Sequence, residues 1–358
     1  MKNIYVHLFN LLEERKSLVL GTIIDTIGSA PQVPGASALF SEEGLIEGTL
    51  GGGLLEFDAQ KKALQALKKR TSLISEFSLH EDLSAEEGAI CGGEVKILID
   101  ASPEVHRDAF HKLSQSLNER QSGVLATFIN KLSEGRVSLL RYWIERAEKI
   151  QIDLEIDHSL FQEEVKDTLT EGKPKLLKIK EEISPEKAEE RLFFLEPIFP
   201  LPQLVIAGAG HIGQVVANLG SLLNFEVTVI DDRAEFANKE RLPGADHVIV
   251  DEIGKSVQDF PISPDTYLVI VTRGHHCDAD ALRECINSDV AYIGMIGSRR
   301  KIKLMRKEFL DQGWATPDQF DRVYAPIGTD IQSKTVEEIA ISIAAQLVLV
   351  RSQIQNKG

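Results

Sequence analysis

The sequence predicts an α/β protein with a Rossmann-like, doubly wound parallel sheet in its C-terminal half and a mixed α+β domain in its N-terminal half. After residue 200, short runs of consecutive apolar residues alternate with helical patterns, as in strands that helices cover on both faces. A glycine-rich loop follows the first run and opens a helix. Earlier in the chain, short β-like runs lie among many glycines. The parallel strands are predicted over residues 204–207, 226–230, 247–250, 267–271 and 291–296.

A proline-rich segment, residues 196–202, separates the two halves. Proline ends regular structure and stiffens a connection, so we expect a first domain over 1–195, a linker over 196–202 and a second domain over 203–358.

Thr335 and Glu338 have the spacing of a capping box before the last helix. In the first domain the patterns predict helices over about 1–20, 55–69 and 104–120, strands over 38–40, 95–99, 123–129 and 136–143, and a solvated helix plus a surface strand between 160 and 190.

The composition disfavours several classes of protein. A formal net charge of −15 lacks the excess of Lys and Arg that binding to nucleic acid requires. No apolar run approaches a membrane span, and the polar residues of the N-terminus interrupt any signal-peptide core. The three cysteines form no C-x-x-C pair, which favours reduced thiols. We expect a cytoplasmic protein that binds neither nucleic acid nor membranes.

The loop from Gly208 to Gly213 has the G-x-G-x-x-G pattern of dinucleotide sites. Gly208 permits a tight turn, Gly210 lets the backbone approach a phosphate, and Gly213 allows close packing of the helix. His211 and Ile212 begin that helix, whose N-terminus offers free N–H groups and a positive dipole end. The loop predicts a site for NAD(P) or another phosphate-bearing ligand; the alternative is a Rossmann domain whose loop has lost its ligand.

Acidic residues end the next predicted strand. Asp231 or Asp232 would accept hydrogen bonds from a ribose diol. Their charge disfavours a 2′-phosphate unless Arg233 compensates it. These positions are therefore compatible with an NAD site.

Two further loops follow later strands, at the edge of the sheet where ligands bind. His275, His276 and Asp278 could hold a metal ion, but adjacent histidines rarely aim at one ion, so polar contacts to a ligand are favoured. The second loop is basic, which suits an anionic ligand or the start of a surface helix. The loops contain Thr272, Arg273, Gly274, His275, His276, Cys277 and Asp278, and Gly297, Ser298, Arg299, Arg300 and Lys301.

Three successive glycines precede a predicted helix in the first domain. Gly51, Gly52 and Gly53 expose consecutive backbone N–H groups, which predicts a second cradle for an oxyanion or phosphate. No Gly-Lys-Ser/Thr follows, so ATP hydrolysis at a P-loop is disfavoured. Glu56, early in the helix, either caps it or contacts a ligand.

Cys91 stands before Gly92 and Gly93, two small residues that allow a ligand or partner to approach. A buried structural role is the commoner outcome for a single cysteine, and a ligand contact is the alternative. Cys277 and Cys285 lack comparable surroundings, and we expect Cys285 in the core.

Together these motifs resemble the XdhC/CoxI family, the accessory proteins for maturation of xanthine dehydrogenase and related molybdenum hydroxylases. The resemblance covers nearly the whole chain. It rests on residues 28–31, 48–56 and 91–93 in the first domain, and on 208–213, 272–275, 292–301 and 335–340 in the second.

The resemblance implies a chaperone that binds the molybdenum cofactor (molybdopterin), protects it while its terminal sulfido ligand is installed, and hands it to the apo-dehydrogenase. A xanthine dehydrogenase-type apoenzyme and a cysteine desulfurase are the implied partners. Cys91 is then the candidate contact to molybdenum or its sulfur, and the two glycine loops are candidate phosphate sites. We expect a homodimer, since burial between subunits would protect a reactive sulfur.

Three positions depart from the family pattern: Gln32 replaces a common arginine, Gln332 a frequent glycine, and Leu54 the cysteine of CoxI-like chains. The last change favours the xanthine dehydrogenase branch. The residues alone also allow an NAD(P)-dependent oxidoreductase or a nucleotide-binding sensor. The first domain has no clear catalytic acid or base that could assist a hydride transfer, so a non-catalytic maturation factor is favoured.

Overall fold

The computed structural model describes residues 3–79, 92–132, 135–146, 158–184 and 187–355. Its internal contacts divide the chain into two compact units, Met1–Pro200 and Leu201–Gly358. None of the described helices combines the length and the hydrophobicity needed to cross a bilayer.

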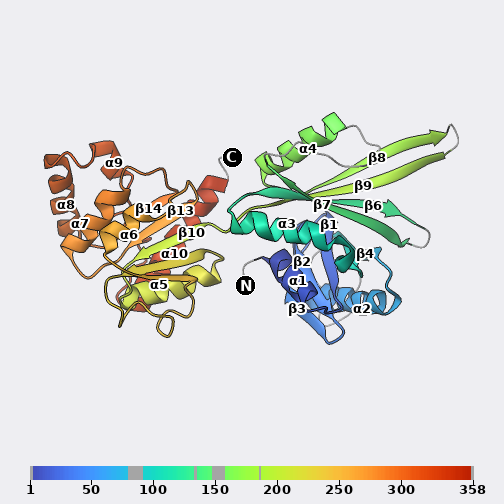
Figure 1. The fold of residues 1–358 in the computed structure, drawn as a ribbon, viewed down its shortest axis with the longest axis horizontal. Helices are drawn as coiled ribbons and strands as arrows, with labels where there is room; N and C mark the ends of the chain where they lie inside the picture. Colours follow the sequence, from blue (N-terminus) through green and yellow to red (C-terminus); the bar gives the residue numbers. More distant parts are fainter. Residues whose placement is uncertain (1–2, 80–91, 133–134, 147–157, 185–186, 356–358) are drawn as a thin grey trace. The chain divides into compact units, whose positions relative to one another are not determined.

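The first unit contains two antiparallel sheets (Figure 1). Sheet A has the order β3-β2-β1-β5-β4, and sheet B has the order β7-β6-β9-β8. The elements are α1 (Ile4–Glu13), β1 (Val19–Ile27), β2 (Ser37–Ser41), β3 (Gly44–Gly48), α2 (Gly53–Lys69), β4 (Leu73–Ser78), β5 (Glu94–Asp100), a 3₁₀ helix (Pro103–His106), α3 (Arg107–Asn118), β6 (Gly123–Lys131), β7 (Val137–Glu145), α4 (His158–Glu171), β8 (Lys175–Ser184) and β9 (Lys187–Ile198).

Helices cover both outer faces of this pair of sheets. Leu55 and Ala59 of α2 pack on one face of sheet A, and Phe161 of α4 packs on the outer face of sheet B. The helices α1 and α3 fill part of the space between the sheets, and beside them Ile24 of sheet A meets Phe194 of sheet B directly. In Figure 1, α2 and α4 form the outer layers of this unit.

A buried ion pair crosses between the two sheets. Arg141 Nη1 lies 2.9 Å from Asp100 Oδ2, and both side chains are almost fully buried. Neither of these two atoms has a hydrogen-bond partner among the described residues, because the approach is off the line that a hydrogen bond needs. The pair therefore joins sheet A to sheet B by charge.

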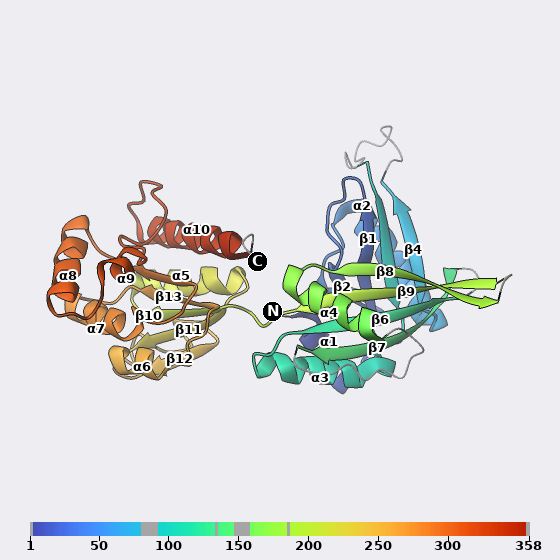
Figure 2. The same ribbon diagram turned by 90° about the horizontal axis from the view of Figure 1, so that it is seen from above.

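The second unit is a parallel sheet with the order β12-β11-β10-β13-β14. Helices α5 and α10 pack on one face, and α6, α7 and α8 pack on the other (Figure 2). This arrangement confirms the predicted Rossmann-like, doubly wound fold. The elements are β10 (Gln203–Ala207), α5 (His211–Leu222), β11 (Glu226–Asp231), β12 (His247–Val250), α6 (Ile253–Asp259), β13 (Thr266–Ile270), α7 (His275–Cys285), β14 (Tyr292–Met295), α8 (Arg299–Asp311), α9 (Pro317–Asp321) and α10 (Val336–Gln355).

Two details of the first unit differ from the sequence expectations. The first helix ends at Glu13, because Arg15 adopts a left-handed backbone that terminates it. The strand β9 continues through Glu196 and Pro197, which were expected in the linker. Proline is tolerated at that point because β8 begins opposite Leu195 and leaves Pro197 a neighbouring strand on one side only.

Candidate functional site

The glycine loop of the second unit lies between β10 and α5, at the point where the strand order reverses. Gly208 has a φ of +117°, and a Cβ there would lie 2.5 Å from the carbonyl oxygen of Val271. At Gly213 a Cβ would collide with the carbonyl oxygen of Gly208. A Cβ on Gly210 would meet nothing within 4 Å, so the N-terminus of α5 faces open space. This is the geometry of an anion site at a helix N-terminus.

Asp231 is buried and holds this loop in place. Its Oδ2 accepts a hydrogen bond from the Ala209 N–H at 2.7 Å, and Arg233 donates to both carboxylate oxygens at 2.8 and 2.9 Å. Burial acts to raise the pKa of Asp231, but the hydrogen bonds from Arg233 and Ala209 outweigh it and hold the pKa below its ordinary value. Asp231 is therefore an ionised positioning residue.

Asp232 is the more accessible of the two carboxylates. It accepts a hydrogen bond from Arg273 Nη2 at 2.7 Å and lies 3.8 Å from Arg233. The contact links the loop after β11 to the loop after β13. Asp232 and Arg273 therefore lie together where ligands enter this fold.

The loop after β13 is organised around Asp278, which is fully buried. Asp278 accepts hydrogen bonds from Thr272 Oγ1 at 2.5 Å and from the Thr272 N–H at 3.1 Å, and it forms an ion pair with Lys301. Burial raises the pKa of Asp278 despite these partners. The pair fixes the start of α7 against the start of α8.

The remaining predicted residues of these two loops have separate roles. His275 lies 3.2 Å from Glu308, and Gly274 precedes α7 with open space where a Cβ would be. Ser298 caps α8 by accepting a hydrogen bond from the Lys301 N–H. Arg299 begins α8, and Gly297 packs against Ile302 and Lys301. No group of three His, Cys, Asp or Glu residues in the described parts of the chain is placed to hold a metal ion.

In the first unit, the glycines before α2 form an open loop. Gly51, Gly52 and Gly53 have φ values of +119°, +72° and +58°, and a Cβ at Gly52 or Gly53 would meet nothing within 4 Å. Glycine suits this left-handed backbone because other residues are strained there. The start of α2 is therefore approachable by a ligand.

Glu56 shapes that loop. Its carboxylate accepts hydrogen bonds from Thr49 Oγ1 at 2.6 Å and from the Leu50 N–H at 2.9 Å. Burial acts to raise the pKa of Glu56, but these bonds and one from the Gly52 N–H lower it below its ordinary value. Glu56 was predicted either to cap the helix or to contact a ligand, and the structure shows it bonded to groups of its own loop.

Three glycine loops that lie far apart in the sequence meet at one end of sheet A. A Cβ on Gly93 would lie 2.5 Å from the Ser29 carbonyl oxygen, and a Cβ on Gly51 would lie 2.6 Å from Pro31 Cγ. The sequence did not predict this meeting. Cys91 lies outside the described residues, but Gly92, the next residue, belongs to this group through its contact with Gly28.

Large apolar side chains are exposed around these loops. Ile27 and Val33 flank the loop after β1, and Leu54 and Phe57 lie in the first turns of α2; each is more than half exposed. Scattered exposed apolar residues are common, but these four belong to segments that come together.

A buried polar cluster beneath the loop after β1 was also missed. Glu196 accepts a hydrogen bond from Tyr5 Oη, and Ser37 lies within hydrogen-bonding distance of Thr22 and Tyr5. A Cβ on Gly35 would lie 3.9 Å from Glu196 Oε1. The only signal in the sequence is one carboxylate inside the apolar run from Leu192 to Ile198.

Comparisons with known proteins agree with this architecture. The protein-family model of the XdhC Rossmann domain matches residues 204–347, and the protein-family model of the XdhC and CoxI family matches residues 11–78. A Bacillus subtilis (strain 168) protein, named as a probable subunit of xanthine dehydrogenase, is 26% identical over 99% of both chains. The uncharacterized protein YqeB of Escherichia coli (strain K12) is 23% identical; the match spans 98% of this chain but only 46% of YqeB.

A solved structure has the same fold. The crystal structure of a Bacillus halodurans protein, described as a xanthine dehydrogenase, superposes with a TM-score of 0.77. It is 27% identical, over 98% of this chain and 96% of that one. With both family models matched in the order of the two units, the chain belongs to the XdhC and CoxI family.

Proposed function

We propose that the chain is an accessory protein of a xanthine dehydrogenase-type molybdenum hydroxylase. On this proposal it binds the molybdenum cofactor, holds it while the sulfido ligand is installed, and delivers it to the apoenzyme. The observation that carries the proposal is the meeting of three glycine loops at one end of sheet A, with Gly92, the residue after Cys91, among them. The names of two related proteins mention xanthine dehydrogenase, which supports the choice of client.

The residues at this end of sheet A fit such a cofactor. The open space at Gly52 and Gly53 would admit a flat pterin ring close to the backbone. A Cys91 thiolate would be a soft ligand for molybdenum or its sulfur. When bound, the cofactor supplies the molybdenum centre that receives the sulfido ligand.

The two glycine loops differ in charge, and we assign them different ligands. Glu56 stays ionised beside Gly51–Gly53, so this loop suits an uncharged ring better than a phosphate. At Gly208–Gly213 the nearby Asp231 is paired with Arg233, which leaves the helix N-terminus free to favour an anion. A separate phosphate-bearing ligand, such as a nucleotide, would bind there.

A second candidate function is that of an NAD(P)-dependent oxidoreductase. The open Gly210 and the accessible Asp232 favour it, since they are placed to meet a pyrophosphate and a ribose. The two functions predict different contents of the purified protein. A fluorescent pterin released by denaturation and oxidation would support the accessory role; nicotinamide dinucleotide alone would support the oxidoreductase.

Cys91→Ala tests the cofactor contact. We expect this variant to retain less molybdenum cofactor, measured as pterin fluorescence per mole of protein, with an unchanged melting temperature. Cys277→Ala, a half-buried thiol in the second unit, is the matched control and should retain the wild-type amount. Equal retention in Cys91→Ala and wild type would remove Cys91 from the site.

The proposal includes partners. A cysteine desulfurase would supply the sulfur, the client apoenzyme would receive the cofactor in the cytoplasm, and the chain would act as a homodimer. Co-purification with a tagged client and sedimentation of the purified chain test these points. A monomer at working concentration would contradict the dimer and leave the cofactor site untouched.

A further inference from the structure

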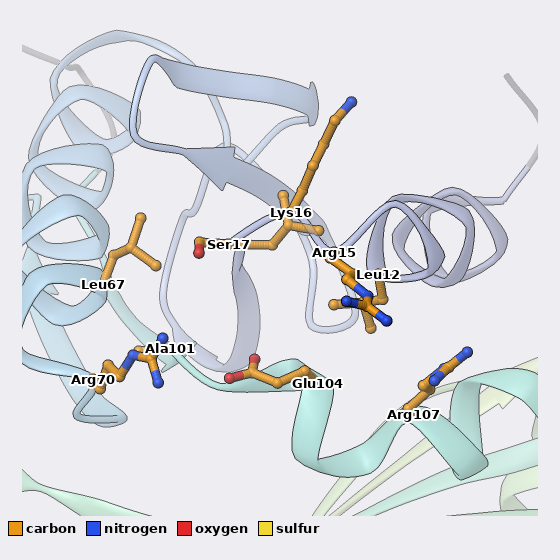
Figure 3. Close-up of a pocket in the computed structure, with 10 residues that line it drawn as sticks. Leu12, Arg15, Lys16, Ser17, Leu67, Arg70, Ala101, Glu104 and Arg107 are labelled. Atoms are coloured by element: carbon orange, nitrogen blue, oxygen red, sulfur yellow. The ribbon is translucent and has the colours of Figure 1, made fainter.

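A basic pocket opens in the first unit, at the end of α2 opposite the glycine loops (Figure 3). The cavity has a volume of about 330 Å³ and is lined by residues at and after the end of α1, residues at the end of α2 and residues around the 3₁₀ helix. The 17 residues of α2 make the helix about 25 Å long, so the pocket and the glycine loop are separate places. The charged side chains of the lining are Arg15, Lys16, Arg70, Arg107 and Glu104.

Two of these cations have no counterion within the described parts of the chain. Arg107 pairs with Glu13, and Lys16 pairs with Glu14 at 2.8 Å. The guanidinium groups of Arg15 and Arg70 form neither an ion pair nor a hydrogen bond with the described residues. In a chain with 55 acidic and 40 basic residues, two such guanidinium groups in one pocket indicate an anionic ligand.

The backbone of both arginines is held by hydrogen bonds at a helix end. Each follows a helix in a Schellman motif: the Arg15 N–H donates to the Leu12 carbonyl at 3.0 Å, and the Arg70 N–H donates to the Leu67 carbonyl at 3.2 Å. Their φ values are +59° and +47°, in the left-handed region where glycine is the usual residue. Arg120 ends α3 in the same way, with a φ of +57°, but does not line the pocket. It provides a matched control.

We propose that this pocket binds a small phosphorylated metabolite, with its phosphate between Arg15 and Arg70. Guanidinium groups bind phosphate through paired, charge-assisted hydrogen bonds. Glu104, drawn between Arg70 and Arg107 in Figure 3, accepts a hydrogen bond from a hydroxyl or amino group of the same molecule. The negative dipole ends of α1 and α2 oppose an anion, but their partial charges are smaller than the full charges of the two arginines. The volume is that of a small-ligand site.

This inference does not rest on the proposed function and is tested by calorimetric titration of the full chain with ribose 5-phosphate and, separately, inorganic phosphate. Arg15→Gly/Arg70→Gly removes both guanidinium groups and gives the backbone the residue it favours, so the melting temperature should hold or rise. Affinity for ribose 5-phosphate should fall about tenfold or more, as on losing charge-assisted hydrogen bonds. Arg120→Gly should bind as wild type does. No binding of either probe by wild type, or unchanged affinity in the double variant, would overturn the proposal.

A second variant separates this pocket from the glycine loop of the second unit. Gly210→Asp puts a carboxylate where a phosphate would sit, and the space there accommodates it. Binding that survives Gly210→Asp and is lost in Arg15→Gly/Arg70→Gly supports the pocket. The reverse pattern overturns the pocket and leaves the nucleotide site of the second unit standing.

Discussion

Tyr5 donates a hydrogen bond to Glu196 inside the first unit, with 2.5 Å between Oη and Oε2. The pair ties α1 to β9, and both side chains are buried. Burial raises the pKa of Glu196 to about 7, although the bond from Tyr5 and the charge of Arg141 act to lower it. A buried carboxyl that titrates near neutral pH makes the stability of this unit depend on pH.

Glu196→Gln tests that dependence. Because the pKa is higher in the folded chain than its ordinary 4.5, the folded chain binds the proton more tightly, and the free energy of unfolding falls as pH rises from 4.5 to about 7. The fall is about 3 kcal/mol at most. Glutamine keeps an acceptor for Tyr5 without titrating, so urea unfolding at about pH 5 and about pH 8 should differ less in the variant. Glu94→Gln, a change at an exposed side chain, should keep the wild-type difference in stability between the two pH values. If the stability of Glu196→Gln fell with pH as steeply as that of the wild type, Glu196 would not be the group responsible.

Asp231→Ala should loosen the glycine loop of the second unit. The change leaves the Ala209 N–H without its acceptor and Arg233 with only the longer contact to Asp232, at a cost of about 2 kcal/mol in the free energy of unfolding. Hydrogen exchange at the Ala209 amide should speed up. Asp232→Ala, on the accessible neighbour, should change stability by less than about 0.5 kcal/mol while weakening nucleotide binding. Equal stability losses in the two variants would show that Asp231 has no special structural role.

Lys301→Met should leave the buried Asp278 without its ion pair. We expect the free energy of unfolding to fall by about 3 kcal/mol, because an unpaired buried carboxylate is costly. Adding Asp278→Asn should restore much of the loss, since the amide carries no charge. The exposed Lys303→Met is the control. If the double variant is less stable than Lys301→Met alone, the ion pair does not explain the loss.

Gln332→Gly should stabilise the second unit slightly. Gln332 has a φ of +59°, where a side chain costs about 1 kcal/mol relative to glycine. Gln312 has a φ of −85°, so Gln312→Gly should instead destabilise by about 0.5 kcal/mol through backbone entropy. Thermal unfolding of both variants tests whether the two changes shift the melting temperature in opposite directions. A lower melting temperature for Gln332→Gly would show that the backbone at Gln332 is not strained.

The second unit could be predicted from the sequence in most of its detail. Its strands are buried on both faces and therefore appear as continuous apolar runs. The capping box is also confirmed: the Glu338 N–H donates to Thr335 Oγ1 at 3.2 Å, and the Thr335 N–H donates to Glu338 Oε2 at 3.0 Å. Local patterns of this kind depend only on neighbouring residues.

Features that depend on distant residues could not be predicted. The end of β9 could not be predicted, because Glu196 and two prolines break the apolar pattern where the strand passes the polar cluster at Tyr5. The glycine loops meet because β1 pairs with β5, which follows it only after three other strands and a helix. For Asp231, the motif gives its place at the end of β11 but not the direction of its carboxylate, which turns toward Ala209.

α2 is one uninterrupted helix, and its two ends face different surroundings: a glycine loop at one end and arginines at the other. At about 25 Å, the separation exceeds the reach of a single small molecule. Two ligands, one at each end of the helix, would therefore bind independently of each other. Each would then add its own increment to the melting temperature, and a mixture would give their sum.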